Sequence, residues 1–313
     1  MSERPIRKVF SIGHVVEDIA APENVAGGGG VYSARTANAL GYETCIISKH
    51  NSDHRFNTSL ASEGIQVITI PSKLDTITSF ENIEIPGSKR KQVVLSRQED
   101  IVIPEISRVL RENTNYGDNC AFIYAPVIGE VVGNVVNFLA DYGYVLAIPQ
   151  GDLRGVKEGK VFQRKMTGFE EKLRRAAVVV LSEEDVFING QEDKILLQKL
   201  RSLGNIFILT RGEKGATIFQ GEKEDNIYPF RLKPGEESLY DVGKGDVFAT
   251  SFFLKYLANH NEHKAGVFAA FFAAIKILNR RVPTLGEIEK FKAKNPDRIR
   301  DFLEENGYRQ RAA

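Results

Sequence analysis

The sequence predicts an α/β fold, in which helices cover both faces of a mostly parallel sheet in a three-layer α/β/α arrangement. The first observation is that short β-rich apolar runs alternate with helix-like stretches along the chain. The second is that VVVLS (178–182) and IFILT (206–210) are almost continuously apolar, as in strands buried on both sides. No internal repeat is present, so residues 1–313 are interpreted as one domain.

The expected strands are runs of apolar and β-branched residues: 8–16, 44–49, 66–70, 120–128, 143–150, 176–183, 205–212 and 216–220. The expected helices between them show helical spacing of apolar residues: 32–41, 131–143, 168–176 and 192–204. The charged segment from residue 289 onward is expected to form short surface helices.

Residues 76–98 interrupt this alternation. Two runs of partly alternating apolar and polar residues flank the basic turn PGSKRKQ (86–92), which indicates a β-hairpin with one face in water. Such an insertion in an α/β protein is suited to be a small lid over a site. The alternative for the basic residues is a solvated turn without a partner.

Composition and charge narrow the classes of function. Hydrophobic residues make up 42% of the chain, which is enough for a sizeable core and too many for disorder. The 42 basic and 41 acidic residues leave a net charge of +1. This balance gives no electrostatic case for binding nucleic acid or an anionic membrane surface, so neither is expected as a partner.

The sequence is also expected to belong to a cytoplasmic protein. Cys45 and Cys120 lie in apolar runs and are expected to be buried, reduced thiols. The N-terminal residues contain no apolar stretch of signal-peptide length, and no window is long enough to span a membrane. The longest apolar stretch, GVFAAFFAAIKIL (266–278), contains a lysine and is interpreted as a buried helix.

Four consecutive glycines occupy residues 27–30. They do not match the dinucleotide fingerprint, because Tyr32 or Ser33 stands where its third glycine is needed. Glycines let a ligand reach the backbone, and the N–H groups that open the following helix point at the same place. We therefore expect a hydroxyl-rich or anionic small molecule here; the alternative is a simple turn before a helix.

The stretch YDVGKGDVF (240–248) holds a second glycine-rich turn, which does not match the classical P-loop. Gly243, Lys244, Gly245 and Asp246 precede a helical pattern, so their N–H groups are expected to form an anion-binding nest. A carboxylate at such a nest makes chemical sense if it takes a proton from a hydroxyl while the nest stabilises a transferred anionic group. The alternative is that Asp246 only caps the helix.

Taken together, these motifs resemble the ribokinase/PfkB family of carbohydrate kinases over nearly the whole chain. GKGD resembles the G-x-G-D signature of the family, and GGGGVYSARTANALG resembles its early Gly-Gly motif. SIGHVVED resembles its first strand, and LTRGEKGA resembles its T-x-G-x-x-G element. The resemblance implies phosphorylation of a sugar, polyol or nucleoside hydroxyl, with ATP as co-substrate and Mg²⁺ as cofactor.

The resemblance also implies roles for individual residues. Asp246 would be the general base, beside an anion hole formed by the backbone of Gly243, Lys244 and Gly245. The nucleotide would contact Thr210, Gly212 and Gly215. The acceptor would be held by Asp18, Gly27, Gly28 and Gly29. The 76–98 hairpin would be the lid, and lids of this kind can pair across a homodimer.

Several positions depart from the family pattern. The leading aspartate of the signature falls on Tyr240, with Asp241 one position late, and this also affects the monovalent-cation site that some members build nearby. Lys244 replaces the usual alanine and is expected to point outward or toward the nucleotide. The N-x-x-E element appears as Ser182 to Asp185; Ser182 would contact the nucleotide and Asp185 would hold Mg²⁺ through water, or both would only form a capping box.

Two further departures concern the ligands. Tyr32 stands where sugar-binding relatives often have asparagine, which suggests stacking on a cyclic polyol or a nucleoside. Ile148 stands where a family strand end has aspartate, and the nearby Arg154 is expected either to reach phosphate or to form a surface ion pair. These departures leave one competing hypothesis from another class, a catalytically inactive kinase-like protein that senses nucleotide or sugar.

Overall fold

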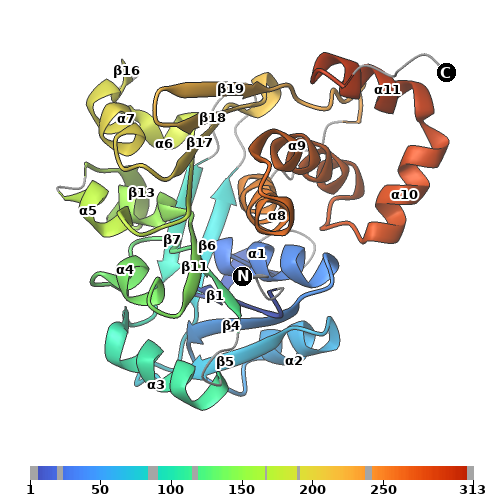
Figure 1. The fold of residues 1–313 in the computed structure, drawn as a ribbon. Coiled ribbons are helices and arrows are strands. Elements are labelled where there is room, and N and C mark those ends of the chain that lie inside the picture. The colour runs from blue at the N-terminus through green and yellow to red at the C-terminus, as the bar shows by residue number, and fades with distance from the viewer. Residues whose placement is uncertain are drawn as a thin grey trace.

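A nine-stranded sheet, parallel along most of its width, forms the centre of the molecule (Figure 1). The structure, a computed structural model, describes residues 6–19, 24–83, 91–114, 119–165, 168–188, 191–236 and 242–308. The strand order is β19 (Lys223–Ile227), β18 (Ala216–Gln220), β17 (Ile206–Thr210), β14 (Val178–Ser182), β11 (Gly143–Ala147), β9 (Cys120–Tyr124), β1 (Lys8–Ile12), β4 (Glu43–Lys49) and β5 (Gln66–Ile70). Only the two pairings that involve β18 are antiparallel, so the predicted sheet is confirmed.

Helices lie on both sides of this sheet, as predicted (Figure 1). Val178 and Val180 of β14 face one core, and Val179 and Leu181 face the other, because successive side chains of a strand point to opposite faces. The first core is covered by α1 (Gly29–Ala39), α8 (Lys244–Asn259), α9 (Glu262–Asn279), α10 (Leu285–Lys294) and α11 (Pro296–Glu305). The second is covered by α3 (Ile103–Asn113), α4 (Val135–Leu139), α5 (Phe169–Leu173) and α7 (Lys194–Arg201), while α2 (Arg55–Ser62) packs against α1.

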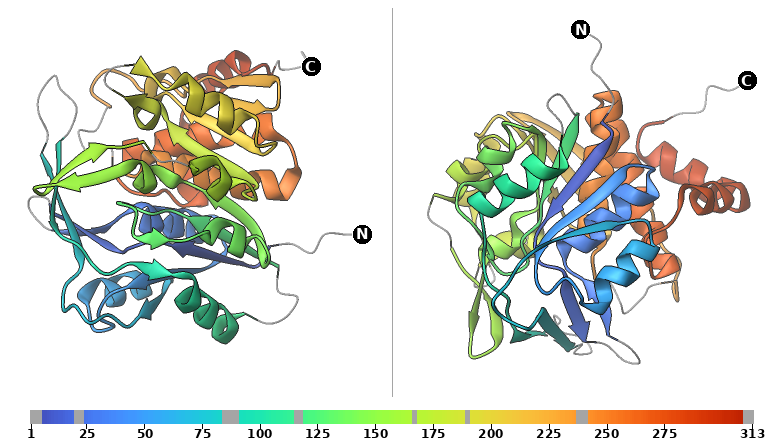
Figure 2. Two further views of the ribbon diagram at one scale, coloured as in Figure 1. Left: turned by 90° about the vertical axis from the view of Figure 1, so that its left-hand side faces the viewer. Right: turned by 90° about the horizontal axis from the view of Figure 1, so that it is seen from below.

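The lid is larger than the predicted hairpin. It is a six-stranded sheet in the order β12 (Arg154–Lys157), β13 (Lys160–Gln163), β7 (Lys91–Ser96), β6 (Thr78–Ile83), β2 (Val16–Ile19) and β3 (Val25–Gly27). It lies at one side of the molecule, beyond the end of the main sheet (Figure 2). The 76–98 hairpin therefore supplies only its two central strands, and segments from two other parts of the chain complete it.

The predicted strand 8–16 is too long, because β1 ends at Ile12 and the chain enters the lid sheet at Val16. Gly13 makes this change of sheet possible, since a Cβ there would lie 2.4 Å from the carbonyl oxygen of Ala125. The expected helix 131–143 is likewise reduced to α4, preceded by a short strand. The remaining short elements are β8 (Ile101–Val102), β10 (Val131–Val132), β15 (Phe187–Ile188), β16 (Gln191–Glu192), α6 (Glu183–Val186), η1 (Pro149–Leu153) and η2 (Gly212–Lys214).

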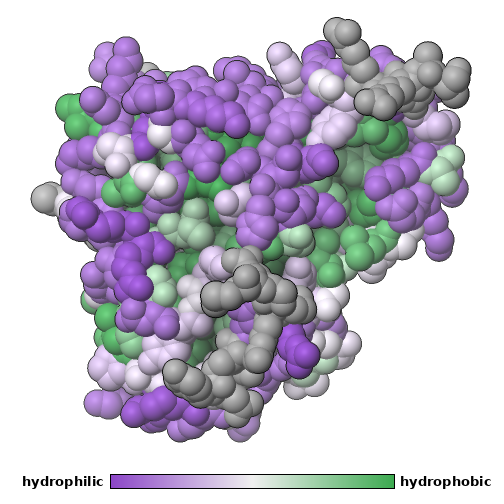
Figure 3. Space-filling view, in the orientation of Figure 1, coloured by the Kyte–Doolittle hydropathy of each residue, from purple (hydrophilic) through white to green (hydrophobic). Residues whose placement is uncertain are grey.

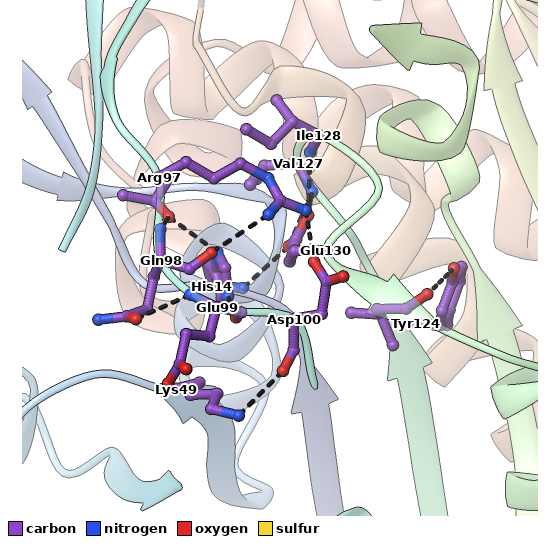
Figure 4. Close-up of polar contacts among 12 residues, drawn as sticks. His14, Lys49, Arg97, Gln98, Glu99, Asp100, Tyr124, Val127, Ile128 and Glu130 are labelled. Atoms are coloured by element: carbon purple, nitrogen blue, oxygen red, sulfur yellow. Dashed lines mark hydrogen bonds and ion pairs between the residues drawn. The ribbon is translucent and has the colours of Figure 1, made fainter. Parts of the chain in front are cut away.

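Buried polar groups tie the lid to the main sheet (Figure 4). His14, which is 1% exposed, contacts Thr78 Oγ1 through Nδ1 at 2.8 Å and the carbonyl of Glu99 through Nε2 at 3.0 Å. Burial lowers the pKa of His14, and a neutral ring that donates to Glu99 and accepts from Thr78 satisfies both contacts. The fully buried Glu130 accepts hydrogen bonds from the backbone N–H groups of His14, Val127 and Ile128. These bonds fix the angle at which the lid leaves the sheet.

Polar residues dominate the visible surface, and apolar residues gather around the centre of the face shown in Figure 3. Within the described ranges, no helix combines the length and the apolar character needed to cross a membrane.

Candidate active site

The GKGD turn, residues 243–246, opens helix α8. Gly243 is the N-cap residue with φ 79°, a left-handed conformation that favours glycine, and a Cβ there would lie 2.3 Å from the ring of Tyr32. The first i→i−4 hydrogen bond runs from Val247 N to Gly243 O at 3.0 Å. The preceding N–H groups thus lie outside the helical ladder, at the positive end of the helix dipole. This arrangement is suited to bind an anion.

Asp246 lies in the first turn of α8, where Gly243 and not Asp246 is the N-cap residue. Burial raises the pKa of the Asp246 carboxyl to about 6, and the negative charge of Asp185 adds to this rise. The positive charges of Arg154 and Lys276 oppose it. The carboxyl is therefore surrounded by charged groups from the lid, from α6 and from α9, and its pKa suits a general base working near neutral pH.

Two carboxylates approach the glycine loop that joins β3 to α1. A Cβ on Gly29 would lie 2.9 Å from Oδ1 of Asp246, and a Cβ on Gly27 would lie 1.9 Å from Oδ2 of Asp18. Gly28, the N-cap of α1, has φ 91°. Any side chain at residues 27 or 29 would collide with a carboxylate, so the glycines keep both carboxylates in contact with bare backbone. The loop thus brings a lid carboxylate and a helix carboxylate to one place.

The lid orients Asp18 through residues that the sequence did not identify. Asp18 is 7% exposed, and Asn82 Nδ2 donates to its Oδ1 at 3.1 Å. Gln92 Nε2 in turn donates to Asn82 Oδ1 at 2.9 Å. The three residues lie on the neighbouring strands β2, β6 and β7. Asn82 and Gln92 are register partners on β6 and β7, so their side chains share one face. The pairing of β2 with β6 was not visible in the sequence.

The residues proposed to contact the nucleotide include two that lie at the ends of adjacent strands. Ser182 ends β14 and Thr210 ends β17, and these two residues are register partners. Gly212 and Gly215, which bound the turn after β17, have φ 57° and 86°. A Cβ on Gly215 would lie 2.0 Å from the carbonyl oxygen of Ile227, so this turn requires glycine. The contact of these residues with a nucleotide stays a prediction.

Asp185 is held by three hydrogen bonds within the protein. Its Oδ2 accepts from Ser182 N at 2.8 Å and from Ser182 Oγ at 2.6 Å, and its Oδ1 accepts from Gln150 Nε2 at 2.9 Å. This is the predicted capping box. The contact of Ser182 with a nucleotide and of Asp185 with hydrated Mg²⁺ stays a prediction. The described residues include no cluster of three or more His, Cys, Asp or Glu side chains placed for a metal. Mg²⁺ often keeps several waters and binds through one or two carboxylates together with substrate phosphates. Asp185 would provide one such carboxylate.

Tyr32 and Lys276 lie beside the GKGD turn. The Tyr32 ring packs on Gly243, so this side chain contacts the turn, and its predicted stacking on a substrate stays untested. Lys276 Nζ lies 5.7 Å from the centre of the same ring. The sequence indicated only that Lys276 interrupts an apolar helix, and that interruption was the available signal.

Other predictions remain open. Lys244 is partly exposed as the first residue of α8, and the direction of its side chain stays a prediction. Tyr240 and Asp241 lie outside the described residues, so the question of the leading aspartate does too.

No protein-family model matches this chain, and no curated protein matches it. Its structure is similar to a sulfate complex of a pyrophosphate-dependent kinase in the ribokinase family, with a TM-score of 0.72, 24% identity, and coverage of 90% of this chain and 99% of the other. It is also similar to a pyrophosphate-dependent kinase in the same family, complexed with a pyrophosphate analog and myo-inositol. The TM-score is 0.70, the identity is 24%, and the alignment covers 91% of this chain and 99% of the other. For fructokinase from Vibrio cholerae O395, bound to fructose, ADP and calcium, the TM-score is 0.67 and the identity is 15%. The alignment covers 91% of this chain and 99% of the other.

These similarities extend over almost the whole of both chains, so this protein has the fold of the ribokinase-family kinases. The predicted fold class and the resemblance drawn from the motifs are confirmed at this level. At such identities the comparison defines the fold, and the activity has to be argued from the site.

Proposed function

We propose that this chain is a ribokinase/PfkB-family kinase that transfers a phosphoryl group from Mg-ATP to a hydroxyl of a sugar, polyol or nucleoside. The observation that carries the proposal is the convergence on one glycine loop of Asp246, with its raised pKa, and the lid carboxylate Asp18. The helix N-terminus beside Asp246 supplies the anion-binding groups that phosphoryl transfer requires.

In the proposed reaction, Asp18 and the backbone of residues 27–29 hold the acceptor so that one hydroxyl points at Asp246. The Asp246 carboxylate accepts the hydroxyl proton while the acceptor oxygen forms a bond to the terminal phosphorus of the donor. The bond from that phosphorus to the bridging oxygen breaks, and ADP leaves with the bonding electrons. The N–H groups of the GKGD turn stabilise the transferred group, and Mg²⁺, when bound, neutralises phosphate charge. Asp246 then loses its proton to solvent.

A cyclic polyol is the acceptor we favour within this class. Asp18 accepts hydrogen bonds, Asn82 offers both an acceptor and donors, and Gln92 extends this polar row along the inner side of the lid. Such a row suits a ring that carries several hydroxyls. The related structure with bound myo-inositol supports the same choice. Homodimerisation through the lid stays a prediction.

A second candidate donor is pyrophosphate. Two structures similar to this chain over 90% and 91% of its length are of pyrophosphate-dependent kinases. Arg154, which acts on Asp246 from the lid, is suited to bind phosphate and makes no demand for a nucleoside. The donor is therefore the first variable to test.

The test measures phosphorylated product by ³¹P NMR with Mg-ATP or Mg-pyrophosphate, across myo-inositol, fructose, ribose and nucleosides. We expect acceptor-dependent product with one donor, and loss of product in Asp246→Asn. Product from pyrophosphate alone would keep the kinase and replace the donor. Binding of ATP without turnover of any acceptor would support the competing hypothesis of an inactive sensor.

A further inference from the structure

Lys276 is buried in an unusual place for a lysine. It lies near the C-terminal end of α9, in the run AAFFAAIKIL (269–278), and its exposed fraction is 2%. An ammonium group taken out of water is stable only if polar or anionic groups compensate for the lost hydration. The contacts of its Nζ therefore indicate what the group does.

The ammonium of Lys276 contacts the peptide that leads into the GKGD turn. Nζ donates to the carbonyl oxygen of Val242, the residue directly before Gly243. The ring of Tyr32 lies against both groups, since it is 5.7 Å from Nζ and would collide with a Cβ on Gly243. Lys276 thus joins α9, α1 and the peptide from which the anion-binding N–H groups begin.

The positive charge of Lys276 also affects Asp246, the proposed general base. Three charged side chains affect the carboxyl of Asp246: Arg154 from the lid and Lys276 from α9 favour its ionised form, while Asp185 from α6 opposes it. Arg154 belongs to the lid sheet, whereas Lys276 belongs to a helix of the core. Of the two cations, Lys276 is thus the one that does not depend on the position of the lid.

We propose that Lys276 is a positioning residue for phosphoryl transfer: its ammonium is a built-in cation that fixes the Val242–Gly243 peptide and aims the N–H groups of the GKGD turn at the transferred phosphoryl group. The inference rests on the proposed function and assigns to the chain the cation that orders its anion hole. A cation at this point assists most when negative charge moves toward the turn during transfer.

The experiment compares Lys276→Met with Lys255→Met. Lys255 is a matched control, because its Nζ lies 5.2 Å from the centre of the Phe268 ring but the residue is exposed on α8. We expect Lys276→Met to lower kcat by about 10- to 100-fold with little change in the acceptor KM. This is less than the about 10²- to 10³-fold that follows loss of a donor in direct contact with the transition state, because Lys276 acts through the turn. Ammonium or potassium ions should restore part of this loss. Lys255→Met should keep the wild-type kcat.

Hydrogen exchange of the amides at residues 243–245 gives a readout that needs no turnover. Lys276→Met should exchange these amides faster and should bind inorganic pyrophosphate at least tenfold more weakly than wild type. If wild type turns over no acceptor but both effects appear, the proposed function fails, while the role of Lys276 in ordering the anion-binding turn stands. Unchanged kcat, exchange and pyrophosphate binding in a folded Lys276→Met would overturn the inference. If that variant does not fold, Lys276→Gln serves for the same measurements.

Discussion

Two of the buried lysines, Lys172 and Lys276, show two different uses of the same side chain. Lys172 lies on α5 and donates to Asp152 Oδ1 at 2.8 Å and to the carbonyl of Val131 at 3.3 Å. Asp152 also accepts from the hydroxyl of Tyr124, which is fully buried in β9. This cluster neutralises its own charge within the scaffold, and the contacts described above for its three side chains do not involve the GKGD turn.

Lys276 instead donates to the backbone carbonyl of Val242, directly before the GKGD turn, and favours the ionised form of Asp246. Its charge is directed at the place where the proposed reaction moves negative charge. The comparison teaches that burial of a charge does not by itself define a functional group; the direction in which the charge acts does. It predicts that Lys172 supports mainly stability and Lys276 mainly activity.

The largest effect on activity is expected at Asp246, in the turn that follows the Val242 carbonyl contacted by Lys276. Asp246→Asn should lower kcat by about 10²- to 10⁴-fold, the usual contribution of a general base. Because burial raises the pKa of Asp246 to about 6, its ionised form costs folding free energy above that pH. The variant should therefore melt no lower than wild type at pH 8, as followed by circular dichroism. A fully active variant would remove Asp246 from the mechanism.

For the cluster around Lys172 we expect a loss of stability without a loss of activity. Lys172→Met leaves the buried Asp152 without its cation and should reduce the free energy of unfolding by about 3–5 kcal/mol. Urea titration measures this loss, and kcat per folded molecule should stay at the wild-type value. The control is Lys199→Met, which breaks a Lys–Glu170 contact of similar length, 2.7 Å, at the surface. That change should cost less than about 1 kcal/mol. Equal losses in the two variants would contradict the comparison.

A smaller effect is expected on the acceptor side. Asp18→Asn removes the charged partner of Asn82 and should lower kcat/KM for the acceptor by about 10- to 100-fold, the range for a hydrogen bond to a charged group. The KM for the donor should not change. Glu17→Gln is the matched control, because Glu17 is adjacent in β2 but bonds to Arg55 and Asn24 instead. If both variants lose acceptor affinity equally, Asp18 has no specific role.

The sequence predicted the main sheet well because its strands are short apolar runs that local patterns reveal. It also predicted that both glycine-rich turns precede helices, since glycines at a turn before a helix are a local signal. The lid was underestimated because β2, β3, β12 and β13 are short and mixed in polarity, and because β2 and β13 join the hairpin across large sequence distances. Lys276 and Asn82 were missed because only the tertiary packing places them against Val242 and Asp18.

The finest test of the comparison is the pH dependence of kcat/KM. The base acts as a carboxylate, so activity should fall tenfold per pH unit below the pKa of Asp246, which is about 6. The positive charge of Lys276 holds that pKa down, so Lys276→Met should move the acid limb to higher pH. A donor phosphate can also titrate near pH 6, but it is identical in both enzymes and cancels in the difference. Lys172→Met should leave the limb where it is, because its charge is neutralised by Asp152. An identical limb in all three proteins would mean that Lys276 does not act on the base.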